Sequence, residues 1–398
     1  MSQSVTDPAS DNHGKVIAFC IEELSVGGAE NMLMLMANEF VERGWRVHMI
    51  CLRQAGELSK GLSQSVTVHV LDKKLGVDVR LPQRYARCIN DIQPDVVNSH
   101  LWVANLWTRV SLLLQKTPII VTEHSRDSWK RGLHRWLDRR LAFRTYRLVT
   151  VSADTANFYR QEVGIKDSLI NVITNGVDTQ VYASGNGQAL RKTWAESTQE
   201  SGDTQEGALI VGTIGRLVAA KNHRRLIDAF ARLLTNRSIP GHAELKLIIV
   251  GDGEDRSNLQ SYIDKRDLGD RILMTGERHD IPDMLAAFDL FVLSSDREGY
   301  PLTALEAQAA ATAVVLTDAG GSGESIAVQG DESGGLLVDK DTEALAQAMA
   351  SLLSDDDLRA RKARFAQQYA LEHFDKRHMI ERYESLFNEA IRARKSTN

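Results

Sequence analysis

Short runs of apolar residues recur along the chain, and each is followed by a polar or glycine-rich loop and then by a segment with helical spacing. These runs lie at 16–21, 45–52, 66–71, 96–98, 119–122, 148–151, 169–173, 209–214, 245–250, 272–275, 288–293 and 313–316. Apolar runs of this length, bounded by turn signals, are typical of strands buried on both faces. Their alternation with helical segments predicts an α/β fold with parallel sheets and right-handed crossovers.

The alternation of strands and helices is interrupted once, near the middle of the chain. Residues 184–207 are rich in Ser, Gly, Gln and Glu and poor in apolar residues, so we place a linker near 176–207. We therefore expect two Rossmann-like domains, at 1–180 and 181–375, separated by a cleft that the carboxyl ends of both sets of strands face. The last 45 residues are strongly helical, and a final helix at about 376–398 could pack back on the first domain.

Composition and charge narrow the class of protein. The 398 residues are 43% hydrophobic and 25% charged, as in ordinary soluble globular proteins. The net charge of −5 argues against general nucleic-acid binding. Three widely spaced cysteines without a metal-ligand pattern favour a reducing compartment, and the polar first residues lack a signal peptide. No apolar run is long enough to span a membrane, so we expect a cytoplasmic protein.

The segment 288–306 carries the strongest candidate chemistry. An apolar run breaks into a polar loop containing Glu298, and Pro301 then fits the first position of a helix predicted at 302–311. Such a helix start presents unpaired N–H groups and partial positive charge, which suits a phosphate. Glu306 lies about one turn inside the helix, so the two glutamates cannot form a proton-passing pair on one face. We expect them to flank a sugar nucleotide, with Glu298 toward the sugar and Glu306 toward the ribose.

Two cations lie in an equivalent loop upstream. Arg216 and Lys221 follow the first strand of the second domain and precede a helix predicted at 224–234. A planar guanidinium and a compact ammonium at a strand's carboxyl end are well suited to holding a diphosphate.

Weaker signals lie at other strand ends. Gly27 and Gly28 open a helix after the first strand and allow close approach of a ligand, although they do not form the GxGxxG signature. His100 and His124 follow neighbouring strands at the edge where open α/β sheets bind ligands. Arg278 lies in a further loop, at a plausible base-binding edge.

A basic and aromatic segment stands out at 129–147. It holds seven Lys or Arg residues and a single acid, Asp138, interleaved with residues such as Trp129, Trp136 and Phe143. This pattern suits the headgroup level of an anionic membrane. A helix packed on the sheet with a solvated basic face explains it equally well, and the sequence leaves both interpretations open.

Taken together, the motifs GGAE, GRLVAAKN, EGYPLTALE and GGSGE resemble the retaining glycosyltransferases of family 4, which have the GT-B fold. The resemblance covers most of the chain. It implies that Arg216 and Lys221 hold the diphosphate of the sugar donor, that Glu298 contacts the transferred sugar and that His124 touches the sugar. The sugar-donor site it implies comprises Gly28, Arg216, Lys221, Arg278, Gly299, Tyr300, Pro301, Leu302, Thr303 and Glu306, while Gly27 and His100 lie on the acceptor side. The chain departs from the family at Ala311 and Ala313, where Gly and then Pro are frequent.

The resemblance also implies transfer with retention of configuration and without an obligatory metal or other cofactor. Arg216, Lys221 and a helix start can neutralise a departing diphosphate, and no carboxylate metal cage is evident in the sequence. The GGAE start and the basic helix are similar to those of bacterial surface-polysaccharide transferases, which suggests a lipid-linked acceptor at the inner face of the cytoplasmic membrane. A sugar-nucleotide 2-epimerase on the same scaffold and a non-catalytic nucleotide-sugar-binding subunit remain the alternatives.

Overall fold

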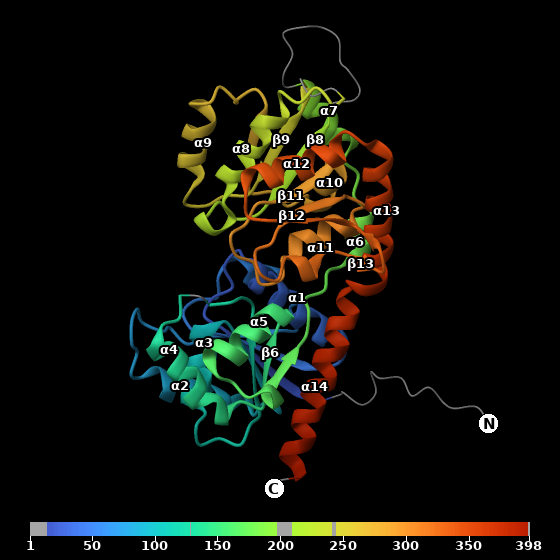
Figure 1. The fold of residues 1–398 in the computed structure, drawn as a ribbon. Helices are drawn as coiled ribbons and strands as arrows, with labels where there is room; N and C mark the ends of the chain where they lie inside the picture. Colours follow the sequence, from blue (N-terminus) through green and yellow to red (C-terminus); the bar gives the residue numbers. More distant parts are fainter. Residues whose placement is uncertain (1–13, 128, 197–208, 241–243, 397–398) are drawn as a thin grey trace, which may run out of the picture. The chain divides into compact units, whose positions relative to one another are not determined.

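The computed structural model describes residues 14–127, 129–196, 209–240 and 244–396 (Figure 1). Within these ranges the chain forms two compact units. The N-terminal unit comprises the described parts of Met1–Asn175 and Met379–Asn398, and the C-terminal unit comprises those of Gly176–His378. Each unit has its own parallel sheet, so the predicted architecture of two Rossmann-like domains is confirmed.

The N-terminal unit is built on a seven-stranded parallel sheet in the order β3-β2-β1-β4-β5-β6-β7. Its strands are β1 (Val16–Ile21), β2 (Arg46–Cys51), β3 (Thr67–Val70), β4 (Val96–His100), β5 (Ile119–Glu123), β6 (Arg147–Thr150) and β7 (Ile170–Val172). Its helices are α1 (Gly28–Glu42), α2 (Leu81–Ile92), α3 (Trp102–Ser111), α4 (Gly132–Leu141) and α5 (Ala153–Phe158).

Side chains of β1 alternate between two cores, as expected of a strand covered on both faces. Ala18 and Cys20 join a cluster with residues of α2 and α3, such as Tyr85 and Ala104. Phe19 points to the other side, where its ring meets Phe40 of α1 and Phe387 of the final helix, α14 (Lys376–Ser396), at centroid distances of 5.8 and 6.3 Å.

The C-terminal unit has a six-stranded parallel sheet in the order β10-β9-β8-β11-β12-β15. Its strands are β8 (Ile210–Ile214), β9 (Lys246–Val250), β10 (Ile272–Gly276), β11 (Leu290–Leu293), β12 (Val314–Thr317) and β15 (Gly335–Val338), with a separate hairpin of β13 (Val328–Gln329) and β14 (Glu332–Ser333). Its helices are α6 (Thr179–Ala183), α7 (Gln188–Glu196), α8 (His223–Leu233), α9 (Arg256–Asp264), α10 (Ile281–Ala287), α11 (Leu302–Ala309), α12 (Thr342–Leu353) and α13 (Asp356–His373).

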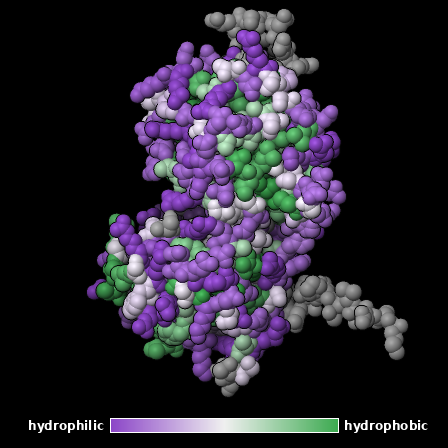
Figure 2. Space-filling view, viewed as in Figure 1, coloured by the Kyte–Doolittle hydropathy of each residue, from purple (hydrophilic) through white to green (hydrophobic). Residues whose placement is uncertain are grey.

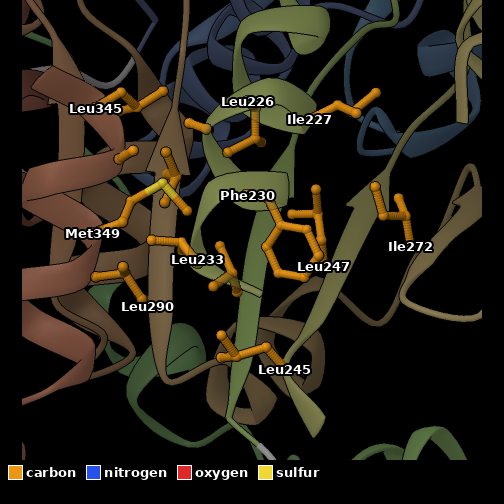
Figure 3. Packing of buried hydrophobic residues seen from close by; sticks show 14 of the residues in the cluster. Leu226, Ile227, Phe230, Leu233, Leu245, Leu247, Ile272, Leu290, Leu345 and Met349 are labelled. Atoms are coloured by element: carbon orange, nitrogen blue, oxygen red, sulfur yellow. The ribbon is translucent and has the colours of Figure 1, made fainter. Parts of the chain in front are cut away.

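The core on one face of this second sheet is formed by α8 and α12. Figure 3 shows Leu226, Phe230 and Leu233 of α8 facing Leu247 of β9 and Met349 of α12. Asn222 caps α8 by accepting a hydrogen bond from the Arg225 N–H at 3.3 Å. This cap fixes the point at which the loop carrying Lys221 becomes helix.

The predicted linker at 176–207 is wrong in its first part. Residues 179–183 and 188–196 form α6 and α7, which pack against α10 in the C-terminal unit, whereas 197–207 lie outside the described residues. The polar composition reflects two solvent-facing helices, of which Trp194 is a buried anchor that stacks on Phe288 with ring centroids 6.1 Å apart.

The units divide at 175/176 and at 378/379, close to the expected positions of 180 and 375. Val177 explains why residues 176–180 belong to the C-terminal unit. Its N–H donates to the Phe374 carbonyl at 2.9 Å, and its own carbonyl accepts from the Lys376 N–H at 2.8 Å.

The last helix, α14, packs on the N-terminal unit for most of its length. Glu384 accepts hydrogen bonds from Arg43 at 2.8 Å and from the Trp45 indole at 3.1 Å. Phe387 lies against both Phe40 and Trp45. Within the described ranges, no helix combines the length and apolar character that crossing a membrane requires.

Candidate active site

Two loops of the C-terminal unit meet at an ion pair. The loop after β8 carries Lys221, the loop after β11 carries Glu298, and Lys221 Nζ lies 2.7 Å from Glu298 Oε1. The strands β8 and β11 are neighbours in a parallel sheet, so their carboxyl ends bring the two loops together. The structure thus joins two residues that the sequence separates by 77 positions.

Glu298 is held on three sides. The Ser295 hydroxyl donates to Glu298 Oε1 at 2.6 Å. The Glu298 N–H donates to the Ala319 carbonyl at 2.6 Å, and its carbonyl accepts from the Gly321 N–H at 3.1 Å. The glycine segment after β12 therefore serves as a backbone support for the loop of Glu298, a role that a sequence motif alone does not reveal.

A second set of contacts fastens the same two loops. Asp296 accepts hydrogen bonds from Arg225 Nη2 at 2.7 Å and from Asn222 Nδ2 at 3.1 Å. The Ser294 hydroxyl donates to the carbonyl groups of Lys221 and Asn222 at 3.1 and 3.0 Å. These supporting residues were missed from the sequence, because Asp, Asn and Arg in loops are common and nothing in their spacing links them.

Glycines in the next loop bring its backbone against the loop of Lys221. Gly251 has φ +129°, and a Cβ at this position would collide with the Gly215 carbonyl. The Leu217 N–H donates to the Asp252 carbonyl at 2.8 Å. A side chain on Gly251 would therefore push apart two loops at the carboxyl edge of the sheet.

Arg216 lies on the same loop as Lys221 but points into solvent. It is exposed and makes no side-chain hydrogen bond or ion pair with any described residue. Arg278, on the loop after β10, is instead committed to Asp280, with its Nε 2.8 Å from Asp280 Oδ1. Arg216 is therefore the more available of the two guanidinium groups.

Helix α11 begins at Leu302, as predicted, although Pro301 is its N-cap and not its first helical residue, and it ends at Ala309, two residues earlier than predicted. Pro301 is the N-cap residue and provides no side-chain cap, so the N–H groups of the first turn face an uncapped start. Ala311 has φ +58°, which shows that the chain makes the left-handed turn without the glycine frequent in the family. Gly299, Tyr300 and Pro301 are buried, while Leu302 and Thr303 are partly buried.

Glu306 lies one turn into α11 and away from the ion pair. Tyr182 of α6 lies near its carboxyl group, and no described contact joins it to Glu298. Burial raises the pKa of Glu306 to about 7, although the neighbouring Tyr182 lowers it. Tyr182 falls in the segment predicted as linker, so no sequence signal pointed to it.

The two histidines of the N-terminal unit are in direct contact. His100 Nδ1 lies 2.9 Å from His124 Nε2, and His100 Nε2 lies 2.8 Å from Asn98 Oδ1. Asn98 Nδ2 donates to the Ile120 carbonyl and the Thr122 hydroxyl, so its Oδ1 is the acceptor for a proton on His100 Nε2. His100 is fully buried at the end of β4 and His124 is partly buried directly after β5.

The same chain of contacts sets the tautomers of both rings. Burial lowers the pKa of His100 well below its ordinary range and the pKa of His124 to about 4, so both rings are neutral near pH 7. His100 Nδ1 is then an acceptor and His124 Nε2 carries a proton, which leaves the lone pair of His124 on Nδ1. The sequence predicted two separate cleft histidines, and the structure shows one coupled pair.

A buried ion cluster lies immediately behind His124. Lys130 Nζ is 3.4 Å from Glu123, 2.9 Å from Asp127 and 3.1 Å from Asp138, and it donates to the Tyr159 hydroxyl at 2.6 Å. Arg109 Nη2 contacts Asp138 at 2.6 Å. Three carboxyl groups therefore share two cations, and Glu123 has the longest contact. Burial raises the pKa of Glu123 to about 7, although Lys130 lowers it.

The glycines of the first loop are placed as expected, at the start of α1. Gly27 is the N-cap with extended backbone and Gly28 is the first helical residue. A Cβ on Gly27 would collide with the Glu30 carboxylate. In the part of the chain that the structure describes, no group of three or more His, Cys, Asp or Glu side chains is arranged to hold a metal ion.

Two family models match consecutive parts of the chain. The model described as Glycosyltransferase Family 4 matches residues 26–181, and the model described as Glycosyl transferases group 1 matches residues 195–369. Among curated proteins, N-acetyl-alpha-D-glucosaminyl L-malate synthase of Bacillus anthracis is 23% identical over 379 residues, which cover 92% of this chain and 95% of that protein. The UDP-Gal:alpha-D-GlcNAc-diphosphoundecaprenol alpha-1,3-galactosyltransferase of Escherichia coli is 27% identical over 322 residues, which cover 78% and 80%.

The fold matches solved structures over nearly the whole chain. The crystal structure of Anabaena HepE in complex with UDP-glucose aligns with a TM-score of 0.80 at 23% sequence identity. The alignment covers 94% of this chain and 99% of HepE.

Proposed function

Because the chain belongs to the family 4 type of glycosyltransferases with the GT-B fold, we propose that it moves a hexose-type sugar from a nucleoside-diphosphate sugar to an acceptor hydroxyl, in the synthesis of a cell-surface polysaccharide. The observation that carries this proposal is the 2.7 Å contact between Lys221 and Glu298, with the exposed Arg216 on the same loop. A cation that would face a diphosphate and a carboxylate that would face a sugar are thereby placed side by side.

Arg216 and Lys221 hold the diphosphate of the sugar donor in this proposal. The uncapped start of α11 adds backbone N–H groups from the segment 299–303. Glu306, steadied by Tyr182, binds the ribose, and the loop of Arg278 lies toward the base. The UDP-glucose in the HepE crystal structure supports a nucleotide-sugar donor.

The chemical step is departure of the nucleoside diphosphate and attack by the acceptor on the same face of an oxocarbenium-like centre. Leaving of the diphosphate develops negative charge, which Arg216 and Lys221 neutralise without a metal ion. Glu298 contacts the transferred sugar, and His124 presents the lone pair of Nδ1 to one of its hydroxyl groups. Gly28 lies toward the sugar donor, and Gly27 and His100 lie on the acceptor side.

The experiment that tests this proposal is turnover of UDP-, GDP- and ADP-sugars with a synthetic lipid-diphosphate glycan acceptor. We expect a product with the anomeric configuration of the sugar donor, read from its NMR coupling, and equal rates with and without EDTA. An inverted product would refute the same-face mechanism, and complete loss with EDTA would refute metal independence. Isomerised sugar nucleotide from incubation without acceptor would favour the 2-epimerase, and binding without turnover would favour a non-catalytic subunit.

A lipid-linked acceptor requires contact with a membrane surface, and α4 is the surface we propose for it. The single buried residue of α4 is its acid, Asp138, which is paired with Arg109 and Lys130. Two of its apolar residues are exposed, Leu133 at 67% and Trp136 at 53%, as is Phe143 just after the helix at 74%, while Leu137 and Leu141 are half-buried. A helix that packed on the sheet with a solvated basic face would bury its large apolar residues and leave its acid exposed.

Cations complete the surface of α4. Arg139, Arg140 and Lys166 line a hollow of about 710 Å³ together with Trp136 and Phe143. None of the three cations pairs with a carboxylate in the described part of the chain. Figure 2 shows hydrophobic residues gathered among hydrophilic ones on the left side of the N-terminal unit. Aromatic and cationic residues together suit the headgroup region of an anionic membrane.

We expect the double variant Arg139→Gln, Arg140→Gln to bind anionic vesicles more weakly by about 2 kcal/mol, roughly 30-fold, because each cation near such a surface contributes about 1 kcal/mol. Sedimentation with phosphatidylglycerol vesicles measures this. The matched control is Arg361→Gln, Arg364→Gln, two exposed arginines of α13 in the other unit. Equal binding of the wild-type protein to neutral and anionic vesicles would refute the proposal that α4 binds an anionic membrane.

A further inference from the structure

A second apolar surface lies on the loop 72–80, between β3 and α2. Leu75, Val77 and Val79 are 84%, 83% and 82% exposed. Among the described large hydrophobic residues only Leu114 is more exposed. Neighbouring large apolar side chains that are this exposed often mark a site that binds a partner or a membrane.

The loop is held in shape by its single buried acid. Asp78 lies between two of the exposed valines but points inward, where its carboxylate accepts from Arg84 Nη2 at 2.6 Å and from the backbone N–H groups of Lys74 and Arg80, each at 3.1 Å. The hydrogen bond from Arg84 holds the pKa of Asp78 at about 2, so the carboxylate remains charged. The segment bends at Leu75 and Gly76, where Gly76 has φ +75°, and turns at Val79 and Arg80, and it leaves Leu75, Val77 and Val79 exposed while Asp78 points inward.

The exposed charges of the loop are Asp72 at its start and, on either side of the apolar residues, Lys74 and Arg80. Lys74 and Arg80 are exposed and form no ion pair with any described residue, whereas Lys73 is paired with Glu22 at 3.2 Å. The loop therefore exposes three apolar side chains between two cations, with Asp78 turned inward and the exposed Asp72 outside that stretch. This arrangement is complementary to an anionic phospholipid surface, which accepts apolar side chains below its headgroups.

The loop is connected to α4 through two intervening helices. It leads directly into α2, α2 packs beside α3, and α3 packs beside α4. In Figure 1 the blue loop, α2 and α4 all lie on the left of the N-terminal unit. The loop and α4 have two features in common. In each an arginine pairs with a buried acid, Arg84 with Asp78 and Arg109 with Asp138, and in each large apolar residues are exposed.

We infer that the loop 74–80 inserts Leu75, Val77 and Val79 into an anionic membrane surface, as a second contact beside α4. This inference rests on the proposed membrane association, but it concerns a different element. Two separated contacts would fix the orientation of the N-terminal unit on the bilayer, which a single amphipathic helix cannot do because the unit could rotate about it.

The test compares three proteins on vesicles of phosphatidylcholine and phosphatidylglycerol in equal parts. The loop variant is Leu75→Ser, Val77→Ser, Val79→Ser, and the control is Val181→Ser, Val328→Ser, Leu371→Ser, which removes exposed apolar residues from the other unit. We expect vesicle binding of the loop variant to fall by about tenfold or more, since three apolar side chains no longer leave water. The control variant should bind as the wild type does, and turnover with a soluble acceptor should be unchanged in both.

A second measurement keeps the inference testable if the triple variant misfolds. Val77→Cys in a Cys88→Ser background, labelled with an environment-sensitive dye, should shift to blue emission on the anionic vesicles. Unchanged emission from vesicle-bound protein would overturn the inference, as would a loop variant that binds like the wild type.

The Arg139→Gln, Arg140→Gln variant distinguishes membrane binding by α4 from membrane binding by the loop 74–80. Loss of binding in that variant with normal binding in the loop variant would refute the loop and leave the α4 surface standing. The reverse result would refute the α4 surface and support the loop. A wild-type protein that does not bind the anionic vesicles would overturn both, while the proposed transfer reaction would still be judged by turnover.

Discussion

Lys221→Ala should lower kcat/KM by about 10²–10³-fold, equivalent to roughly 2.7–4 kcal/mol of barrier, by analogy with the loss of one group that stabilises developing negative charge. Lys221 Nζ is already positioned by its 2.7 Å contact with Glu298, so in the proposed reaction no reorganisation is needed as the diphosphate departs. Steady-state kinetics with a saturating acceptor measures the effect.

The control for this variant is Lys265→Ala, which removes an exposed lysine at the end of α9 in the same unit and should leave kcat/KM unchanged. Glu298→Gln keeps the acceptor oxygen for Ser295 but removes the charge next to Lys221, so the two variants should be strongly non-additive. Near-full kcat/KM in Lys221→Ala, with native thermal stability, would contradict the assigned role.

Lys130→Met should reduce the free energy of unfolding by about 3–5 kcal/mol, the cost typical of removing one partner from a buried ion pair. The Lys130 ammonium is fully buried among Glu123, Asp127 and Asp138. Without it Asp138 keeps only Arg109, and the buried Glu123 and the partly buried Asp127 lose their cation. Urea unfolding of the wild-type and variant proteins measures the difference.

The matched comparison for the buried lysine is Glu162→Ala, which removes an exposed carboxylate and breaks its pair with Arg135 at 2.9 Å. Exposed pairs contribute about 0–1 kcal/mol, so this variant should be nearly as stable as the wild type. Similar losses in both variants would mean that the cluster behind His124 has no special role in stability.

Much of the fold follows from local apolar runs, because strands buried on both faces must be apolar throughout. β1 was predicted with its observed bounds at 16–21, and most other predicted strands differ from the observed ones by only one or two residues at an end. β15 was not predicted, because the GLLV run at 335–338 is short and follows a hairpin and not a helix, so it lacks the helix-strand alternation that identified the other strands.

The candidate site was only partly visible in the sequence. Lys221 and Glu298 were chosen for their positions after parallel strands, and adjacency of β8 and β11 brings them together. The coupling of His100 to His124, and that of Glu306 to Tyr182, depends on side-chain directions that residue type does not encode. The sequence also did not predict that α4 buries its acid and exposes apolar residues, because burial of Asp138 depends on Arg109 and Lys130, which lie outside that helix.

The packing of α14 has a consequence for biosynthesis. Phe387 and Tyr383 complete the aromatic cluster around Phe19 and Phe40, so the N-terminal unit cannot close this side of its core until the ribosome has added all of Gly176–His378. Domains usually fold in the order in which they emerge. Here the second unit can finish first, and the nascent first unit must keep an apolar sheet face shielded, for instance by a chaperone, until its last helix arrives.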